Sequence, residues 1–229
     1  MSIAILNYQR RDALRRALES ARSQRFPVEI LAVDNGSTDG SADMVRDEFP
    51  DVRLVRLPDN IAAAARNVGV ATAKGDIVFT LDNDVLLSTS DDVARGLEVF
   101  QRHPRAAIVS FTIVGADDAI CRRDWCHPRD PDEWGEHEFP TDYVLEGASA
   151  CRREAFLASG GYWPPLFIGR WLASRAHERS VDVEQHELRA AAHPRVRSRP
   201  VMMLRKMPNQ LNSGTVPSTS QVTSVRCCI

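Results

Sequence analysis

Short apolar runs alternate with amphipathic segments along the first 115 residues of the chain. The run at residues 2–6 has the character of a buried parallel strand. The segments between the runs place apolar side chains at helical spacing, with charged residues on the other face. The predicted strands cover residues 2–6, 28–33, 52–56 and 76–81, and the predicted helices cover 11–23, 42–48 and 60–73. This order predicts an α/β fold in which helices cover both faces of a parallel sheet.

Polar loops follow the predicted strands, at the edge where parallel sheets bind their ligands. These loops begin at Asn7, Asp34, Leu57 and Asp82. The first loop lacks the G-x-G-x-x-G pattern, and the chain has no G-x-x-x-x-G-K-[ST] motif, which argues against a dinucleotide site and a P-loop. A nucleotide held at this edge therefore needs carboxylates and a metal rather than a glycine-rich cradle.

Asp82 and Asp84 follow the last of these apolar runs and are spaced two residues apart. In an extended segment such residues point to the same side, so the two carboxylates are expected to converge on one ligand. Close carboxylates repel each other unless a cation or hydrogen-bond donors neutralise them. An oxygen-lined site with few protein ligands favours Mg²⁺ or Mn²⁺ bridging to phosphate. The competing interpretation is a strand-end turn, where Asp and Asn are common.

Composition and charge exclude several classes of protein. The 229 residues suffice for one large α/β domain, or for one domain with a small appendage. A net charge of −2 provides no general basic field for nucleic acid. No apolar run approaches the roughly 20 residues that span a bilayer, and the first residues lack a secretory signal. We therefore expect a cytoplasmic protein with no transmembrane segment.

Four motifs in a fixed order resemble those of the family 2 glycosyltransferases with the GT-A fold. An ordered set of motifs is much more specific than a D-x-D pattern alone. The GT-A fold implies a Rossmann-like, mostly parallel sheet flanked by helices on both faces. Within the family, the motifs are most similar to the bacterial rhamnosyltransferase-like branch. The four motifs occupy residues 5–8, 33–41, 64–69 and 81–84, and further resemblance at 146–156 and 160–162 extends the match to about residue 169.

The resemblance implies a role for four residues at the strand ends and for Arg66 in the helix predicted over 60–73. Tyr8 would contact the base of the donor nucleotide, and Asp34 would accept a hydrogen bond from the imide N–H of uracil or thymine. Arg66 would lie near the base or the diphosphate. Asp82 would face the ribose and a metal-bound water, while Asp84 would bind Mg²⁺ or Mn²⁺. Structural interpretations stay open beside these: Tyr8 caps a loop, Asp34 begins an Asx turn, and Arg66 pairs with a helix neighbour.

The reaction implied by the resemblance is a metal-dependent, inverting sugar transfer. The donor would be a UDP- or dTDP-sugar and the acceptor a saccharide or lipid-linked saccharide, as in polysaccharide biosynthesis. A lipid-linked acceptor is compatible with peripheral association at a membrane. A sugar-nucleotide pyrophosphorylase is disfavoured, because residues 7–10 do not form the glycine-rich, basic loop that such an enzyme needs.

The segment after Gly169 departs from the family pattern. Family members carry an acidic pair there, one member of which deprotonates the acceptor hydroxyl, whereas this chain has Arg170. A guanidinium stays protonated and cannot act as that base. Glu146 is a weak substitute. The alternative function is a glycosyltransferase-like protein that binds nucleotide-sugar but lacks the general base. Other acidic residues nearby are Glu178, Asp182 and Glu184.

We expect two functional halves followed by a tail. Residues 1–115 would form the donor-binding half, 116–190 the acceptor-side half, and 191–229 an irregular or disordered tail. The long polar loop after residue 114 contains Trp125 and Trp134, which either shape a sugar-acceptor surface or pin the loop through their own rings. The remaining predicted elements are a helix over 91–102, a strand over 106–114, a return to the sheet at 143–147 and a helix over 152–159.

Overall fold

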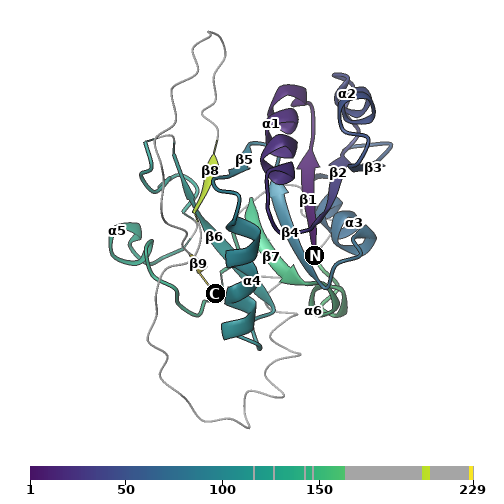
Figure 1. Cartoon of the computed structure of the whole chain (residues 1–229). Coiled ribbons are helices and arrows are strands. Elements are labelled where there is room, and N and C mark those ends of the chain that lie inside the picture. The colour runs from purple at the N-terminus through teal and green to yellow at the C-terminus, as the bar shows by residue number, and fades with distance from the viewer. Residues whose placement is uncertain are drawn as a thin grey trace.

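The computed structural model describes residues 1–162, apart from 116, 126, 142 and 146, together with two short strands at 203–206 and 227–228. These parts of the chain form a mixed sheet with helices on both faces (Figure 1). The strand order is β3-β2-β1-β4-β7-β6-β8-β5, and β9 pairs with β6. The predicted α/β architecture is confirmed.

The first half follows the predicted strand–helix order. Its strands β1 (Ser2–Asn7), β2 (Glu29–Asp34), β3 (Arg53–Arg56) and β4 (Ile77–Asp82) pair in parallel. The helices between them are α1 (Arg11–Arg22), α2 (Ser41–Glu48) and α3 (Ala65–Thr72). A 3₁₀ turn, Ala62–Ala64, precedes α3. The helix predicted over 60–73 therefore begins later than expected, because Ala62 has a φ of 52° that regular α-helix does not allow.

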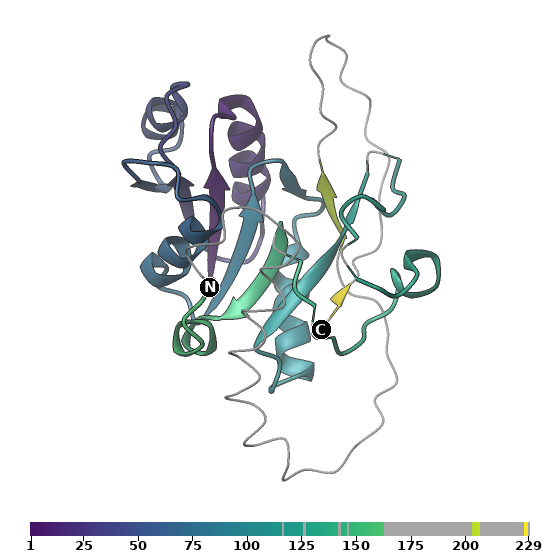
Figure 2. The same ribbon diagram turned by 180° about the vertical axis from the view of Figure 1, so that it is seen from behind.

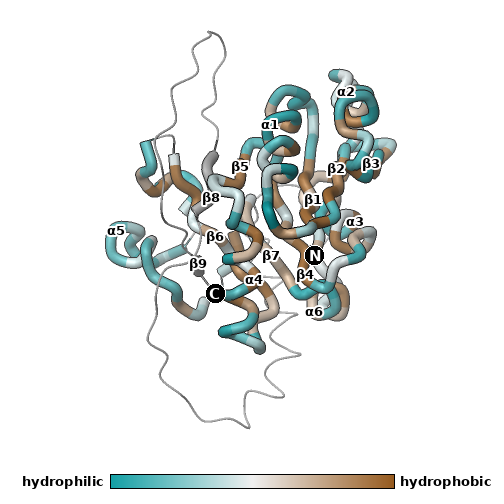
Figure 3. The backbone as a smooth tube through the Cα atoms, in the orientation of Figure 1, coloured by the Kyte–Doolittle hydropathy of each residue, from teal (hydrophilic) through white to brown (hydrophobic). Residues whose placement is uncertain are grey.

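Alternation along β1 divides the core between the two faces of the sheet. Ile3 and Ile5 belong to the apolar cluster that includes α1 and α2, whereas Ala4 belongs to the cluster beneath α3. Gly69 lets α3 approach closely, since a Cβ there would lie 3.2 Å from both Ala4 Cβ and Val33 Cγ2. The hydrophobic strands between more polar helices are visible in Figure 3. Successive side chains of the strand thus pack against the apolar faces of helices on opposite sides of the sheet.

Strand β7 (Ala148–Arg152) joins the two halves of the sheet. It runs antiparallel to β4 on one side and to β6 (Ile108–Val114) on the other. Helix α4 (Asp92–Arg102) packs into the same cluster as α1, and α6 (Arg153–Ala158) packs beside α3 on the opposite face (Figures 1 and 2). The remaining elements are β5 (Val85–Leu87), α5 (Pro131–Trp134), β8 (Met203–Lys206) and β9 (Cys227–Cys228).

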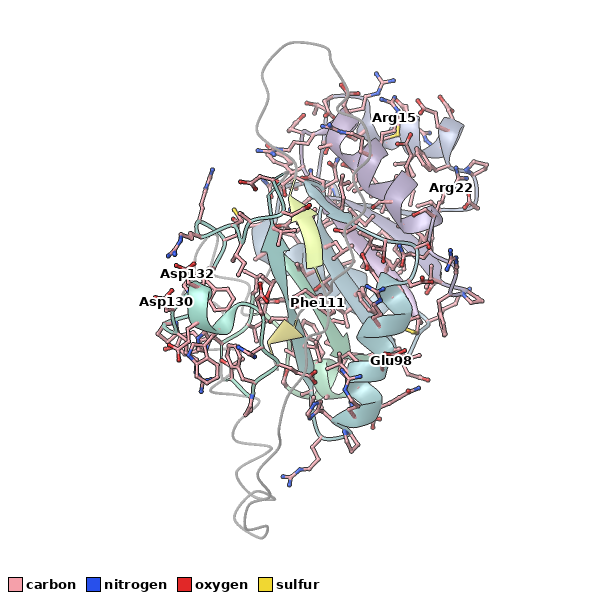
Figure 4. The ribbon with its side chains drawn as sticks, turned by 60° about the vertical axis from the view of Figure 1, so that its left-hand side comes forward. Arg15, Arg22, Glu98, Phe111, Asp130 and Asp132 are labelled. Carbon is pink, nitrogen blue, oxygen red and sulfur yellow. The ribbon has the colours of Figure 1, made fainter. Side chains whose placement is uncertain are left out.

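Aromatic stacking links the two halves within the core. Phe79 of β4 and Phe111 of β6 have ring centroids 5.4 Å apart and planes inclined by 12°. Figure 4 shows Phe111 in the interior between the sheet and α4. Both rings are almost fully buried, so they contribute apolar area as well as stacking.

Two predictions about the second half differ from the structure. The return to the sheet was expected at 143–147, but the strand begins at Ala148. Its small side chains have weak strand propensity, yet they fit between two neighbouring strands, where Ser149 Oγ lies 2.8 Å from Thr80 Oγ1. The tail expected to be irregular contributes β8 and β9. The rest of that tail lies outside the described residues.

The loop between β6 and β7 is held by its own side chains. The Arg129 guanidinium carbon lies 3.9 Å from the ring centroid of Trp134 and 4.5 Å from that of Phe139. Trp125 Nε1 donates a hydrogen bond to the Arg129 carbonyl at 2.6 Å. These contacts favour the interpretation that the aromatic residues pin the loop.

Candidate functional site

The carboxyl ends of β1, β2 and β4 bring the predicted donor-site residues to one edge of the sheet. In the parallel register, Asn7 pairs with Asp34 and Leu6 pairs with Asp82. This is the upper edge in Figure 1, where the arrows of β1 and β4 end. Strand-end side chains that are distant in the sequence therefore become neighbours, as the alternating pattern predicts.

Asn7 is the hub of this edge. It is fully buried, and its Nδ2 lies 3.4 Å from Asp34 Oδ1 and 3.2 Å from Ser37 Oγ. Asn83 Nδ2 donates to Asn7 Oδ1 at 2.7 Å. One amide thus ties together the loops after β1, β2 and β4. The sequence predicts Asn7 in a polar loop and gives it no role at the site. The feature of the sequence that points to Asn7 is its position directly after an apolar strand, at the edge where the aspartates also lie.

Asp34 is a fully buried carboxylate with one unsatisfied oxygen. Its Oδ2 has no hydrogen bond among the described residues, and Arg56 Nε lies 3.9 Å away. Leaving a buried acceptor without a hydrogen bond costs about 1–3 kcal/mol, so such a group is unusual unless a ligand supplies a donor. The hydrogen bond to Asp34 Oδ1 comes from the Asn7 side chain, which is not the pattern of an Asx turn.

Arg66 and Asp82 form an ion pair across the edge, from Arg66 Nη2 to Asp82 Oδ1. The Arg66 side chain is buried, and the Asp82 side chain is about one-third exposed. The backbone approaches Asp82 closely at Gly147, where a Cβ would lie 3.0 Å from Asp82 Oδ2. Arg66 therefore pairs with the β4 carboxylate, in contrast to the structural interpretation in which it pairs with a helix neighbour.

Asp84 does not lie in an extended segment with Asp82. Strand β4 ends at Asp82, and residues 83 and 84 form the turn into β5. The two carboxylates therefore do not share the extended i, i+2 geometry that the sequence predicts, because the chain turns at residues 83 and 84 before β5. Asp84 Oδ2 lies 3.2 Å from Arg10 Nη1. Each carboxylate of the pair thus has its own arginine.

The carboxylates at 82 and 84 suit a hard divalent cation. Mg²⁺ and Mn²⁺ prefer oxygen donors, and Mg²⁺ is commonly held by one or two carboxylates together with substrate phosphates. The described residues contain no cluster of three or more His, Cys, Asp or Glu side chains that would hold a metal by themselves. Two carboxylates are a donor set of the kind that Mg²⁺ takes together with phosphate oxygens.

The rim of the edge is formed by Tyr8 and the loop after β2. Tyr8 is 45% exposed, which leaves its ring accessible. Asn35 Oδ1 accepts from the Ile61 N–H at 2.9 Å and thereby fixes the segment that leads into α3 and Arg66. Gly36 has a φ of +78°, and a Cβ there would lie 2.8 Å from the Asp59 carbonyl carbon. Asn35 and Gly36 are positioning residues that the sequence interpretation left without a role.

The same loop is anchored by Asp39. Its Oδ2 accepts from the Arg11 N–H at 2.8 Å, and its Oδ1 accepts from Ser41 Oγ at 2.6 Å. Burial acts to raise the pKa of Asp39, but these hydrogen bonds outweigh it and hold the pKa below its usual value. The carboxylate therefore stays ionised and joins the start of α1 to the start of α2.

Helix α3 is also tied to the Gly-Gly-Tyr segment. Asn67 Oδ1 accepts from the Tyr162 N–H at 2.8 Å, and Asn67 Nδ2 donates to the Tyr162 carbonyl at 2.7 Å. Gly161 has a φ of +63°, and a Cβ there would lie 2.5 Å from Asn67 Oδ1. Two motifs 95 positions apart are thus joined directly.

The residues considered for the catalytic base lie outside the described part of the chain. This applies to Glu146 and to everything between residues 163 and 202, including Arg170. The assignment of Glu146 stays a prediction.

The family of the chain follows from its match to a family model. The model described as Glycosyl transferase family 2 matches residues 2–159, well over half of the chain. The chain belongs to glycosyl transferase family 2. The matched range includes all five described residues of the predicted donor site. Within the family, the rhamnosyltransferase-like branch stays a prediction.

Curated members of family 2 resemble the chain over part of their length. It is 30% identical over 149 residues to the uncharacterized glycosyltransferase YibD of Escherichia coli strain K12, covering 62% of the chain and 38% of YibD. It is 35% identical over 88 residues to the UDP-Glc:alpha-D-GlcNAc-diphosphoundecaprenol beta-1,3-glucosyltransferase WfaP of Escherichia coli, covering 37% of the chain and 35% of WfaP. The family 2 chain thus spans little more than a third of these relatives.

Solved glycosyltransferases share the fold. The S. aureus TarS 1–349 structure in complex with UDP-GlcNAc has a TM-score of 0.61 at 14% identity and covers 94% of this chain and 61% of TarS 1–349. The Pyrobaculum calidifontis mannosyltransferase PcManGT, in complex with GDP-Man and Mn²⁺, has a TM-score of 0.55 at 20% identity and covers 75% of this chain and 49% of PcManGT. The predicted GT-A fold is confirmed for this family 2 member.

Proposed function

We propose that the chain transfers a sugar from a UDP- or dTDP-sugar to a saccharide or lipid-linked acceptor, with inversion and with a divalent cation. The observation that carries this proposal is the buried Asp34 carboxylate, whose Oδ2 has no hydrogen bond among the described residues. A uracil or thymine base supplies the missing donor through its imide N–H. The exposed ring of Tyr8, one residue beyond β1, offers a face for the base.

The remaining edge residues suit the diphosphate and the ribose. Arg66 is buried beside the site and carries a planar guanidinium of the kind that binds phosphate oxygens in a bidentate manner. Asp82 is partly exposed and can accept hydrogen bonds from ribose hydroxyls. Asp84, with Asp82, would hold Mg²⁺ or Mn²⁺. When bound, such a cation neutralises the charge that develops on the leaving nucleoside diphosphate.

Proteins of similar sequence or fold support a nucleotide-sugar donor. WfaP is described as using UDP-Glc, and TarS structures contain UDP or UDP-GlcNAc. PcManGT was solved with GDP-Man and Mn²⁺. Guanine also carries N–H donors, and a titration that includes GDP therefore tests the identity of the base.

Inverting transfer requires a carboxylate that takes the proton of the acceptor hydroxyl. Asp82 and Asp84 are paired with arginines at the donor edge, and we assign the base to Glu146 as a proposal. The family match gives no support to the alternative of a protein that binds donor without transfer. A sugar-transfer assay with an E146Q variant separates the two, because retained donor binding with lost transfer is expected if Glu146 is the base.

Calorimetric titration with UDP, dTDP and GDP in the presence of Mn²⁺ tests the donor assignment. We expect UDP or dTDP to bind at least about tenfold more tightly than GDP. In D34N, an amide N–H replaces the Oδ2 acceptor and opposes the imide N–H, so UDP affinity should fall about tenfold, or ~1.4 kcal/mol. D47N, on the exposed face of α2, removes the same charge and should bind as wild type.

Two results would contradict the assignment. Unchanged UDP affinity in a folded D34N protein removes Asp34 from base recognition. Failure of the wild type to bind any of the three nucleotides with Mn²⁺ overturns the proposed function.

A further inference from the structure

Arg10 lies at the donor edge and has no part in the roles assigned above. Its Nη1 is 3.2 Å from Asp84 Oδ2, which joins the loop after β1 to the turn after β4. We propose that Arg10 is the resident counter-cation of Asp84, neutralising this carboxylate while the donor is absent and moving to the diphosphate when nucleotide and metal bind. This inference rests on the proposed function and adds a positioning residue to it.

The side chain of Arg10 is accessible to solvent, while its backbone is held. The Arg10 side chain is 47% exposed and that of Asp84 only 16%, so the arginine is the member of the pair with solvent around it into which it can turn. The Arg10 carbonyl accepts from the Leu14 N–H at 2.9 Å, and the neighbouring Arg11 N–H donates to Asp39 Oδ2 at 2.8 Å. The guanidinium can therefore leave Asp84 without any change in the path of the chain.

The second arginine of the edge behaves differently. Arg66 is only 7% exposed and pairs with Asp82 from within the fold. A half-exposed ion pair such as Arg10–Asp84 is weak and easily exchanged, whereas removing one partner of a buried pair is costly. Of the two carboxylates, Asp84 is thus the one whose counter-cation can be replaced.

Because only the counter-cation of Asp84 can be replaced, the binding of the metal is coupled to the binding of the nucleotide. A divalent cation that binds alone must displace the Arg10 guanidinium into water. When a nucleoside diphosphate is present, the guanidinium gains phosphate oxygens in exchange for the carboxylate. Metal and nucleotide should therefore each raise the affinity for the other by the same factor, as linkage requires.

The metal-only arm of the test uses Mn²⁺ titrations followed by the EPR signal of free Mn²⁺, without nucleotide. R10Q should bind Mn²⁺ about twofold to fivefold more tightly than wild type, because the competing charge is gone. R11Q removes the same charge one position away, keeps its backbone N–H bond to Asp39, and should match wild type. Equal Mn²⁺ affinity in R10Q and R11Q, or weaker binding in R10Q, overturns the proposal.

The coupling arm measures UDP affinity by calorimetry with and without Mn²⁺, after subtraction of the UDP–Mn²⁺ interaction in buffer. The enhancement of UDP binding by Mn²⁺ should fall about fivefold in R10Q and recover in part in R10K, which restores a point charge. An unchanged enhancement in R10Q overturns the exchange. If wild type binds no UDP under either condition, the proposed function fails, and the metal-only arm still decides whether Arg10 competes for Asp84.

Discussion

At the scale of single residues, the donor edge depends on buried polar groups rather than on apolar packing. The side-chain amide of Asn7 uses both its atoms. The oxygen accepts from Asn83, and the nitrogen donates to Asp34 and Ser37. Such groups stabilise a structure only while every partner is present, since a lone buried donor or acceptor costs more than the bond contributed. The geometry of the edge is therefore sensitive to changes at residues that need not touch the donor.

Replacement of Asn7 by alanine tests this dependence. N7A leaves the Asn83 amide and Asp34 Oδ1 without their partner, so we expect a loss of about 2–3 kcal/mol in the free energy of unfolding. Urea unfolding should show a lower midpoint with an unchanged slope. T38A removes an exposed side-chain contact of the same loop and should change stability by less than about 0.5 kcal/mol. Equal stability of N7A and wild type would contradict the role of Asn7 as a hub.

At the scale of elements, the sequence pattern predicted the first half well. Apolar runs located β1, β2 and β4, because a strand buried on both faces has no polar alternation to obscure it, and β3 at the sheet edge was located by a shorter apolar pair. The pattern was less informative for β7, where Ala148, Ser149 and Ala150 carry no strand signal of their own. Their strand conformation is imposed by β4 and β6 on either side.

The site was likewise predictable only in part. The sequence placed the strand ends at Asn7, Asp34 and Asp82 along a common edge, and the register shows that β1, β2 and β4 end together. The pairing of Asp84 with Arg10 could not be predicted, since it depends on the turn at Asn83 and on a side chain 74 positions away. The spacing of residues within one segment predicts the directions of their side chains. It does not predict which distant residue a side chain in a turn will contact.

The strand starts at the opposite edge are tied by Glu29. Its Oε2 accepts from Ser2 Oγ at 2.6 Å and from the Lys74 N–H at 2.8 Å, which joins β1, β2 and the approach to β4. Burial acts to raise the pKa of Glu29, but these hydrogen bonds and the charges of Lys74 and Arg53 outweigh it and lower the pKa. A lowered folded-state pKa gives stability that is present above the unfolded-state value and is lost as the pH falls through the folded-state value.

We therefore expect E29Q to destabilise the protein by about 1 kcal/mol at pH 7. The difference from wild type should shrink as the pH falls through the lowered pKa of Glu29, because the wild-type side chain then becomes protonated as well. Urea unfolding at pH 7 and in acid measures both values. E98Q, on the exposed face of α4, serves as the matched control and should show a small difference at either pH. A difference for E29Q that does not depend on pH would contradict the role of the ionised carboxylate.

At the scale of the whole molecule, the central question is whether the two predicted halves are independent. The division at residue 115 into a donor-binding half and an acceptor-side half stays a prediction. Strand β7 pairs with β4 of the first half and β6 of the second, and the Phe79–Phe111 stack crosses the same boundary. A continuous sheet with a shared core predicts one cooperative unfolding transition.

The distribution of chromophores allows this to be measured. All four tryptophans lie beyond residue 115, at 125, 134, 163 and 171, whereas α1, α2 and α3 contribute to the far-UV circular dichroism from the first half.

Saturation with UDP and Mn²⁺ at about 100 times the dissociation constant should stabilise the folded state by about 2.7 kcal/mol, which corresponds to a rise in Tm of roughly 5–10 °C. If the halves share one core, tryptophan fluorescence and circular dichroism must shift together, although the ligand binds only at the edge of the first half. At the same ligand concentration, D34N should show about half of this shift with both probes, because its affinity is about tenfold lower. A rise in Tm seen by circular dichroism, with no change in the Tm seen by fluorescence, would mean that the halves unfold separately. The stabilisation by the bound donor would then not extend across β7 to the second half.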